Sequence, residues 1–128
     1  MEIENIKFKA KRLDNGEWII GSFVVMKIPA LSKTTIGIVA ADGATLHEIA
    51  PTTVCQFTGL IDCEGNEIWE HDLLQSRETR AIYEVVWDEN GGFIIKNSVG
   101  GGHLLNFLGS ILSIFNFKVV GNKFDKEK

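Results

Sequence analysis

Four residues of the kinds that bind zinc recur through the middle of the chain at intervals of eight: His47, Cys55, Cys63 and His71. Thiolate sulfur and imidazole nitrogen are the ligands that zinc takes most often in proteins. Known zinc sites draw them from close pairs such as C-x₂₋₄-C, because one turn then presents two ligands at once. No two of these four residues are that close. The spacing therefore favours two reduced thiols in the core and two imidazoles on the surface, and we predict no metal site and no cofactor.

The acidic loop of residues 62–72 is the second candidate for chemistry. Its early residues are spaced like the first ligands of a calcium-binding EF-hand, but that motif requires Gly at its sixth position and Glu at its twelfth. Glu67 and Leu73 stand there instead. Paired carboxylates for acid–base catalysis could come from Glu67, Glu70 and Asp72, yet nothing nearby indicates a raised pKa. A solvated turn is the simpler interpretation, with Asp72 hydrogen-bonded to a neighbouring turn. We predict no catalytic residue, and the ligand-binding residues stay unknown.

Basic and aromatic residues suggest a third kind of site, one for nucleic acid. A basic strand near the N-terminus could face phosphates, and Trp18, Trp69 and Trp87 could stack on bases. The formal net charge of −4 disfavours a large phosphate-binding surface, since such affinity depends mainly on Lys and Arg. Aromatic residues that fill a small β core, and a solvated strand face, account for the same pattern. The basic strand comprises Lys7, Lys9, Lys11 and Arg12.

The length and composition of the chain limit the kinds of fold that can position these residues. At 128 residues, 45% hydrophobic and 23% charged, the chain is long enough for one packed domain and is not of a disordered type. Thirteen glycines against two prolines favour many tight turns. The most apolar stretch, residues 103–120, is interrupted by polar residues and falls short of the about 18 apolar residues of a membrane span. The first residues lack the apolar region of a secretion signal. We expect a cytoplasmic protein without membrane association.

Hydrophobic alternation predicts strands along most of the chain. Residues Ile6 to Lys11 alternate, Glu17 to Met26 continue as an apolar strand, and Asp14-Asn15-Gly16 between them tolerates positive φ, so residues 6–26 are predicted to form a β-hairpin. Asp42-Gly43 indicates a second hairpin, and the residues at 88–92 a third. A further turn is expected at 62–66. Strands are expected at 34–41, 45–49, 54–57, 72–75, 80–87, 93–97 and 117–120.

The apolar spacing changes to a helical period near the C-terminus. Leu104, Leu108 and Ile111 are three to four residues apart, which predicts a short helix over residues 103–114. Gly100–Gly102 before it could cradle an anion at the helix N-terminus, but without a P-loop lysine the triplet indicates a hinge. The fold predicted is a single α+β, predominantly β domain over residues 1–128. It would form an antiparallel sheet or a small SH3-like barrel, with one short C-terminal helix.

The order of several sequence blocks resembles the YopX-type family of phage and prophage proteins. The similarity covers about half of the chain, in order and along its length. It implies a small, mostly β protein of phage or prophage origin and no particular reaction. The matching blocks are Asp14-Asn15-Gly16-Glu17-Trp18, Pro51 with Thr53-Val54, Gln56-Phe57-Thr58-Gly59-Leu60, the acidic loop through Trp69 to Leu74, Tyr83-Glu84-Val85-Val86-Trp87 and Val119-Val120-Gly121-Asn122.

His71 departs from the family pattern, which usually has Gly at this position. If that Gly has a positive φ, His71 is strained there, although His tolerates such a conformation better than most residues. The function that we expect is non-enzymatic: an intracellular accessory protein that acts through a protein partner or through self-association. The alternative is nucleic-acid binding by the basic N-terminal strand. The apolar stretch from Leu104 to Phe115 is expected to be either buried or subunit-facing.

Overall fold

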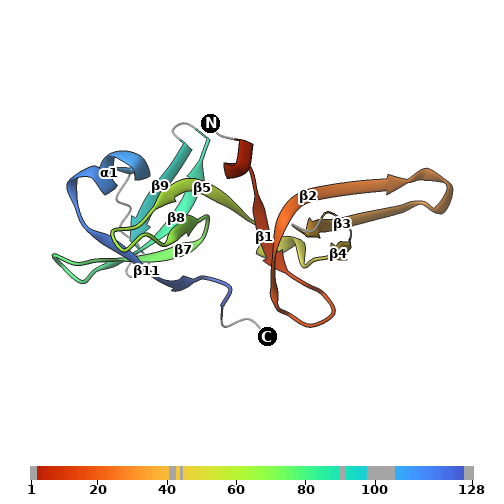
Figure 1. Cartoon of the computed structure of the whole chain (residues 1–128), viewed down its shortest axis with the longest axis horizontal. Coiled ribbons are helices and arrows are strands. Elements are labelled where there is room, and N and C mark those ends of the chain that lie inside the picture. Colours follow the sequence, from red (N-terminus) through yellow and green to blue (C-terminus); the bar gives the residue numbers. More distant parts are fainter. Residues whose placement is uncertain (1–2, 41–42, 44, 90–91, 98–105, 126–128) are drawn as a thin grey trace. The chain divides into compact units, whose positions relative to one another are not determined.

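The computed structural model of the chain describes residues 3–40, 43, 45–89, 92–97 and 106–125 (Figure 1). These residues form mainly antiparallel strands, as the sequence predicts, with one short α-helix. Their contacts divide the chain into two compact units, the first ending at Phe57 and the second beginning at Thr58. The division falls within β5 (Cys55–Ile61). That residues 1–128 make a single domain stays a prediction.

The first unit is built on a meander of antiparallel strands. Its strand order is β4-β3-β2-β1-β5. The predicted hairpin around Asp14-Asn15-Gly16 is confirmed, because β1 and β2 pair from Phe8 opposite Gly21 to Lys11 opposite Trp18. The hairpin around Asp42-Gly43 is confirmed by the pairing of β3 with β4, although Asp42 itself lies outside the described residues. The elements here are η1 (Ile3–Asn5), β1 (Phe8–Lys11), β2 (Trp18–Ile28), η2 (Pro29–Leu31), β3 (Lys33–Ala40), β4 (Leu46–Glu48) and η3 (Pro51–Thr53).

β2 and β3 form the longest ladder of the chain. Their register runs without a break from Gly21 opposite Ala40 to Ile28 opposite Lys33. The short 3₁₀ turn η2 closes the hairpin, with Ser32 in the left-handed region at a φ of 49°. The buried core of this unit is small and consists of Ala10, Ile38 and Ile49.

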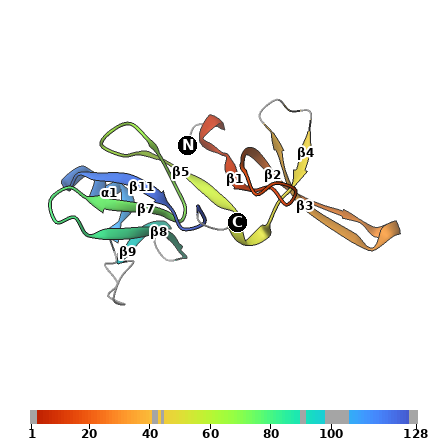
Figure 2. The same ribbon diagram turned by 90° about the horizontal axis from the view of Figure 1, so that it is seen from below.

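The second unit contains the remaining strands and the helix (Figure 2). β7 to β11 form a sheet in the order β10-β9-β8-β7-β11, while β5 continues beside β6. The sequence did not predict β6. Neither described sheet closes on itself, so the open-sheet alternative is confirmed and the SH3-like barrel is not. The elements are β6 (Glu67–Trp69), β7 (Asp72–Ser76), β8 (Ile82–Asp88), β9 (Gly92–Asn97), β10 (Asn106–Phe107), α1 (Leu108–Ile114) and β11 (Phe117–Asn122).

The predicted helix exists but is shorter than residues 103–114. Asn106 and Phe107 pair as a strand with Ile95 and Ile94 of β9, so the helix begins at Leu108. A residue whose backbone bonds to a neighbouring strand cannot also join the helical ladder, and this pairing sets the boundary. Residues 103–105 and the predicted hinge at Gly100–Gly102 lie outside the described residues.

One apolar cluster forms the core of the second unit. The helix supplies two of its members, so part of the apolar stretch at the C-terminus is buried within the unit, whereas Phe115 is 43% exposed. The cluster is Ile68, Leu74, Val85, Ile95, Leu108, Ile111 and Phe117.

Candidate functional site

The acidic loop is held together by Asp62, whose side chain lies inside the loop and not in solvent. Oδ1 accepts hydrogen bonds from the backbone N–H groups of Glu64 and Asn66 at 2.8 Å each. Oδ2 accepts from the N–H of Val119 at 2.9 Å and from the side-chain amide of Asn66 at 3.2 Å. Burial raises the pKa of the Asp62 carboxyl, but these donors outweigh it and hold the pKa below its usual value. Asp62 therefore stabilises the turn and ties it to β11, and the solvated-turn interpretation is wrong for this residue.

Asp72 has a comparable structural role at the start of β7. It is 2% exposed. Its Oδ2 accepts a hydrogen bond from the backbone N–H of Trp69 at 2.8 Å, and its Oδ1 accepts from Asn122 Nδ2 at 2.9 Å. The predicted hydrogen bond to a neighbouring turn is confirmed. These contacts occupy both carboxylate oxygens, which leaves Asp72 poorly placed to exchange protons with a substrate.

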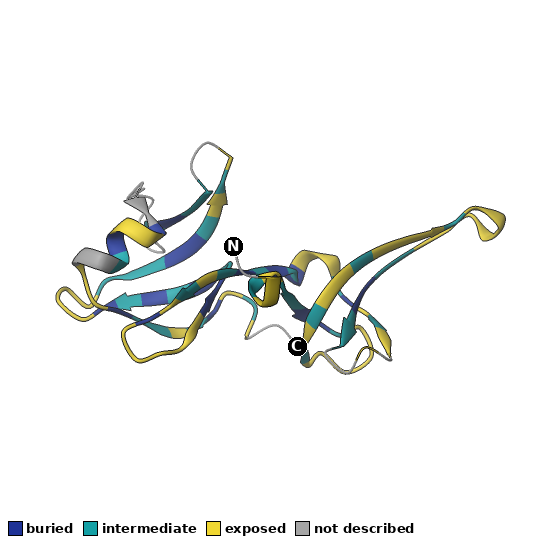
Figure 3. Ribbon diagram, turned by 45° about the horizontal axis from the view of Figure 1, so that its top comes forward, coloured by how far each residue is buried: buried dark blue, intermediate teal, exposed yellow. Residues whose placement is uncertain are grey.

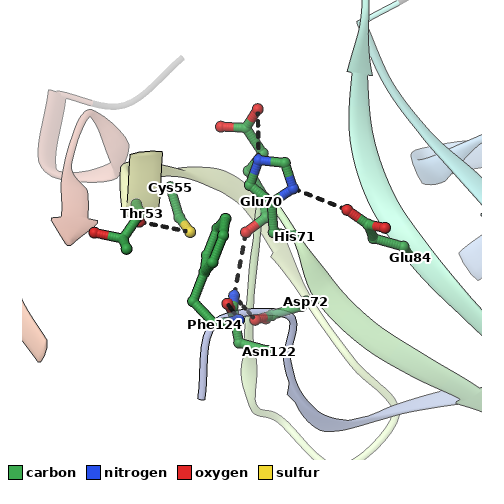
Figure 4. Close-up of polar contacts among 8 residues, drawn as sticks. All are labelled: Thr53, Cys55, Glu70, His71, Asp72, Glu84, Asn122 and Phe124. Atoms are coloured by element: carbon green, nitrogen blue, oxygen red, sulfur yellow. Dashed lines mark hydrogen bonds and ion pairs between the residues drawn. The ribbon is translucent and has the colours of Figure 1, made fainter. Parts of the chain in front are cut away.

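His71 lies between two carboxylates in the turn before β7 (Figure 4). Its Nδ1 donates a hydrogen bond to Glu84 Oε2 at 2.9 Å, and its Nε2 lies 3.6 Å from Glu70 Oε2. The ring packs edge-on against Phe124, with centroids 5.2 Å apart. The backbone φ of His71 is 68°, so the strained conformation expected at this departure from the family pattern is confirmed. Side-chain contacts hold His71 in a conformation that glycine adopts more readily.

The residues of the zinc hypothesis have separate environments. Cys55 is buried and its thiol donates to the carbonyl oxygen of Thr53 at 3.3 Å, whereas Cys63 is exposed. His47 lines an open hollow with Asp14 and Glu48. Within the described residues, no group of three or more His, Cys, Asp or Glu side chains is arranged to hold a metal ion. The interpretation of both cysteines as core thiols holds for Cys55 and is wrong for Cys63.

The basic N-terminal strand lies against aromatic rings. Lys9 Nζ is 4.6 Å and Lys11 Nζ is 5.5 Å from the ring centroid of Trp18, and Lys7 Nζ is 4.7 Å from that of Phe57. Lys11 is only 7% exposed. Ammonium groups held over aromatic faces are partly desolvated and already engaged. This arrangement leaves the strand less open to phosphates than its sequence suggests, although nucleic-acid binding itself stays a prediction.

The outer part of the β2–β3 hairpin, residues 22–36, exposes several apolar side chains, and we call it the arm. All of its residues are described and none is buried (Figure 3). Val25 is 51%, Met26 43% and Leu31 68% exposed. Lys27 and Lys33 are its only charged residues. Side chains alternate between the two faces of a strand, so Val25 and Met26 place apolar surface on both faces of the arm.

Sequence reasoning identified the acids and His71 but not the arm. A signal was present, because β2 reads as a continuous apolar run from Phe23 to Met26 without the alternation of a half-buried strand. Continuous runs are typical of strands covered on both faces. The contact between His71 and Glu84 left no such signal, since it joins a turn residue to a residue of β8 that is 13 positions away.

A family model matches nearly the whole chain. The family model described as YopX protein matches residues 7–127, nearly the whole chain, and so confirms the resemblance seen in the sequence blocks. A search of curated proteins finds no matching relative. None of the helices among the described residues has the length and apolar character needed to cross a bilayer.

Proposed function

This chain belongs to the YopX protein family, and on that premise we propose that it is a cytoplasmic accessory protein of phage or prophage origin that acts through protein contacts, without catalysis. The observation that carries the proposal is the arm. Its apolar residues are exposed on both faces of a two-stranded ribbon. Contiguous exposed apolar surface on a soluble protein is typical of a binding interface.

The stability of the arm supports the same proposal. An isolated two-stranded hairpin is marginally stable in water, and three or more strands or a packed face are needed for independent stability. Beyond Gly21, β2 pairs with β3 alone among the described strands. A partner that covers the arm would supply the further strand or packed face that a two-stranded ribbon needs. Binding of the partner would therefore also stabilise the arm.

The carboxylates that could serve catalysis support a non-enzymatic role. Asp62 and Asp72 have both oxygens occupied by hydrogen bonds from the protein itself. Glu70 and Glu84 both lie beside the His71 ring, with carboxylate oxygens 3.6 Å from Nε2 and 2.9 Å from Nδ1. These contacts stabilise turns, which accounts for the acidic loop without a substrate.

The test is capture of partners from host cytosol by the full-length chain, together with its solution mass. Replacing Val25 and Met26 by Ser should lower capture or self-association about tenfold or more, because two anchor residues of an interface would be lost. The matched control replaces Leu13 and Ile61 by Ser, since these are 61% and 58% exposed and lie outside the arm. A wild-type chain that is monomeric and captures nothing contradicts the proposal, as does an arm variant that binds as well as the control.

A further inference from the structure

The outer edge of β2 is a sheet edge without a strand beside it over residues 22–28. β1 pairs with β2 from Trp18 to Gly21, and no other described strand continues along that edge. Along an antiparallel strand, every second residue points its N–H and C=O to the same side. Half of the backbone groups of residues 22–28 therefore face outward, and such a row is a template for another strand.

This edge lacks the features that normally protect an edge strand. Natural edges are blunted by prolines, bulges or several charged side chains. Residues 22–28 read Ser-Phe-Val-Val-Met-Lys-Ile, with no proline and one charge, and their register with β3 has no bulge. The opposite edge of the arm differs, because β3 lacks a neighbouring strand only over Lys33 to Thr35: the carbonyl oxygen of Ile36 accepts a hydrogen bond from the N–H of Ile49 at 3.2 Å, and β4 pairs with β3 from Gly37 onward. Of the two edges, the β2 edge is the one suited to pairing.

We propose that a second copy of this chain pairs with the arm, β2 against β2 in antiparallel fashion, about a two-fold axis at Val25. This inference rests on the proposed function and specifies the partner. The result is a four-stranded sheet of two arms, which reaches the number of strands that a free-standing sheet needs. Each copy uses its β2 edge once, so the assembly closes as a dimer.

The side chains of residues 22–28 are complementary to themselves in this register. Val25 faces its own copy, Val24 faces Met26, and Phe23 faces Lys27, each pair occurring twice. The chain already uses lysine against an aromatic ring between antiparallel strands: Lys11 is the register partner of Trp18, and its Nζ lies 5.5 Å from the ring. Phe23 retains 37% exposure and can take the same contact from Lys27 of the second copy. Lys27 and its copy lie on opposite sides of the axis, which keeps the like charges apart.

The first measurement is the solution mass of the full-length chain and of Val25→Lys. The wild type should have twice the 14.2 kDa of one chain. In Val25→Lys two like charges meet at the axis, so the dimer should dissociate about tenfold or more readily. Val25→Glu should behave likewise, and an equimolar mixture of the two variants should form a heterodimer because opposite charges then face each other. Circular dichroism of each variant checks that the fold is kept.

The second measurement is disulfide trapping at the axis. Facing residues of antiparallel strands have Cα atoms about 4.5–5.5 Å apart, within the range of a disulfide. Val25→Cys in a Cys63→Ser background should form covalent dimers on mild oxidation. Val120→Cys in that background is the matched control, being a strand valine of 44% exposure in the other unit, and should stay monomeric.

The outcomes separate this inference from the proposed function. A dimer that Val25→Lys does not weaken, or a Val25→Cys chain that cross-links no better than the control, overturns β2 pairing. A chain that is monomeric at all concentrations yet captures a host protein through the arm overturns the inference and leaves the proposed function standing. A monomer that captures nothing overturns both.

Discussion

The two units differ in how far the side chains of their strands are buried. In the second unit the residues of β7 alternate between buried and half-buried, with Asp72, Leu74 and Ser76 buried, and Leu74 joins a single core with the helix. In the first unit β2 is the longest strand of the chain, and none of its residues is buried. Other elements of the chain thus cover the buried face of β7, whereas the continuous apolar run of β2 stays exposed to solvent. The proposed second copy of the chain would cover it.

The largest expected difference between the two units is the loss of stability when an apolar side chain is truncated. Leu74→Ala should lower the free energy of unfolding by about 2–5 kcal/mol, because Leu74 is fully buried and the substitution leaves a cavity. Val25→Ala in the arm should change it by no more than about 0.5 kcal/mol, as expected for a surface residue. Urea denaturation of dilute protein, where self-association does not contribute, measures both. Equal losses at the two positions would remove the distinction between the units.

The buried carboxylate of Asp62 in the second unit predicts a smaller loss of stability. Asp62→Ala leaves the N–H groups of Val119, Glu64 and Asn66 without their acceptor, which should cost about 1–3 kcal/mol. The control is Glu64→Ala, which removes an exposed ion pair with Arg77 and should cost about 0–1 kcal/mol. The same denaturation experiment compares the two variants. An Asp62 variant as stable as the control would show that Asp62 does not stabilise the turn.

The lowered pKa of Asp62 predicts how this contribution depends on pH. The folded pKa lies below the ordinary value of 3.8, so the unfolded chain binds the proton more tightly. The stabilisation is therefore complete above that ordinary value and is lost as pH falls through the folded pKa. Asp62→Asn lacks this titration, and its free energy of unfolding should fall less steeply in acid than that of the wild type. Parallel pH profiles for the two proteins would contradict the assignment.

His71 offers a measure of backbone strain in the turn before β7. At a φ of 68°, His71→Ala keeps the strain and loses the contact with Glu84, whereas His71→Gly loses the contact but relieves the strain. The glycine variant should therefore be about 1 kcal/mol more stable than the alanine variant. Thermal unfolding of both variants beside the wild type tests this. An alanine variant at least as stable as the glycine variant would show that the conformation costs nothing.

The smallest expected effect is on nucleic acid. Lys7 lies over Phe57 and Lys9 over Trp18, and the chain carries a net charge of −4, so we expect no gel shift of duplex or single-stranded DNA or RNA even at low salt. A retarded complex that disappears as salt is raised would instead establish the basic strand as a binding surface in the first unit.

Much of the fold was predictable because it depends on local signals. The turn at Asp14-Asn15-Gly16 and the hydrophobic strands on either side are contained within neighbouring residues, and two of the three described hairpins of the first unit, β1–β2 and β3–β4, followed from such signals. The start of the helix was not predictable. The spacing of the apolar residues places Asn106 and Phe107 inside the predicted helix, but both residues pair with β9 instead. β6 was missed because its three residues are too few to show a period.

The sequence by itself determined the family, the β-rich class and the departure at His71, since these depend on residue identity and on spacing along the chain. Only the tertiary structure decided which acids are buried, because one donor to each of Asp62 and Asp72 comes from β11, 50 residues or more away in the chain. It also decided that the apolar run of β2 is exposed. A continuous apolar strand is compatible with burial or with exposure, and the difference depends on whether other elements of the chain reach it.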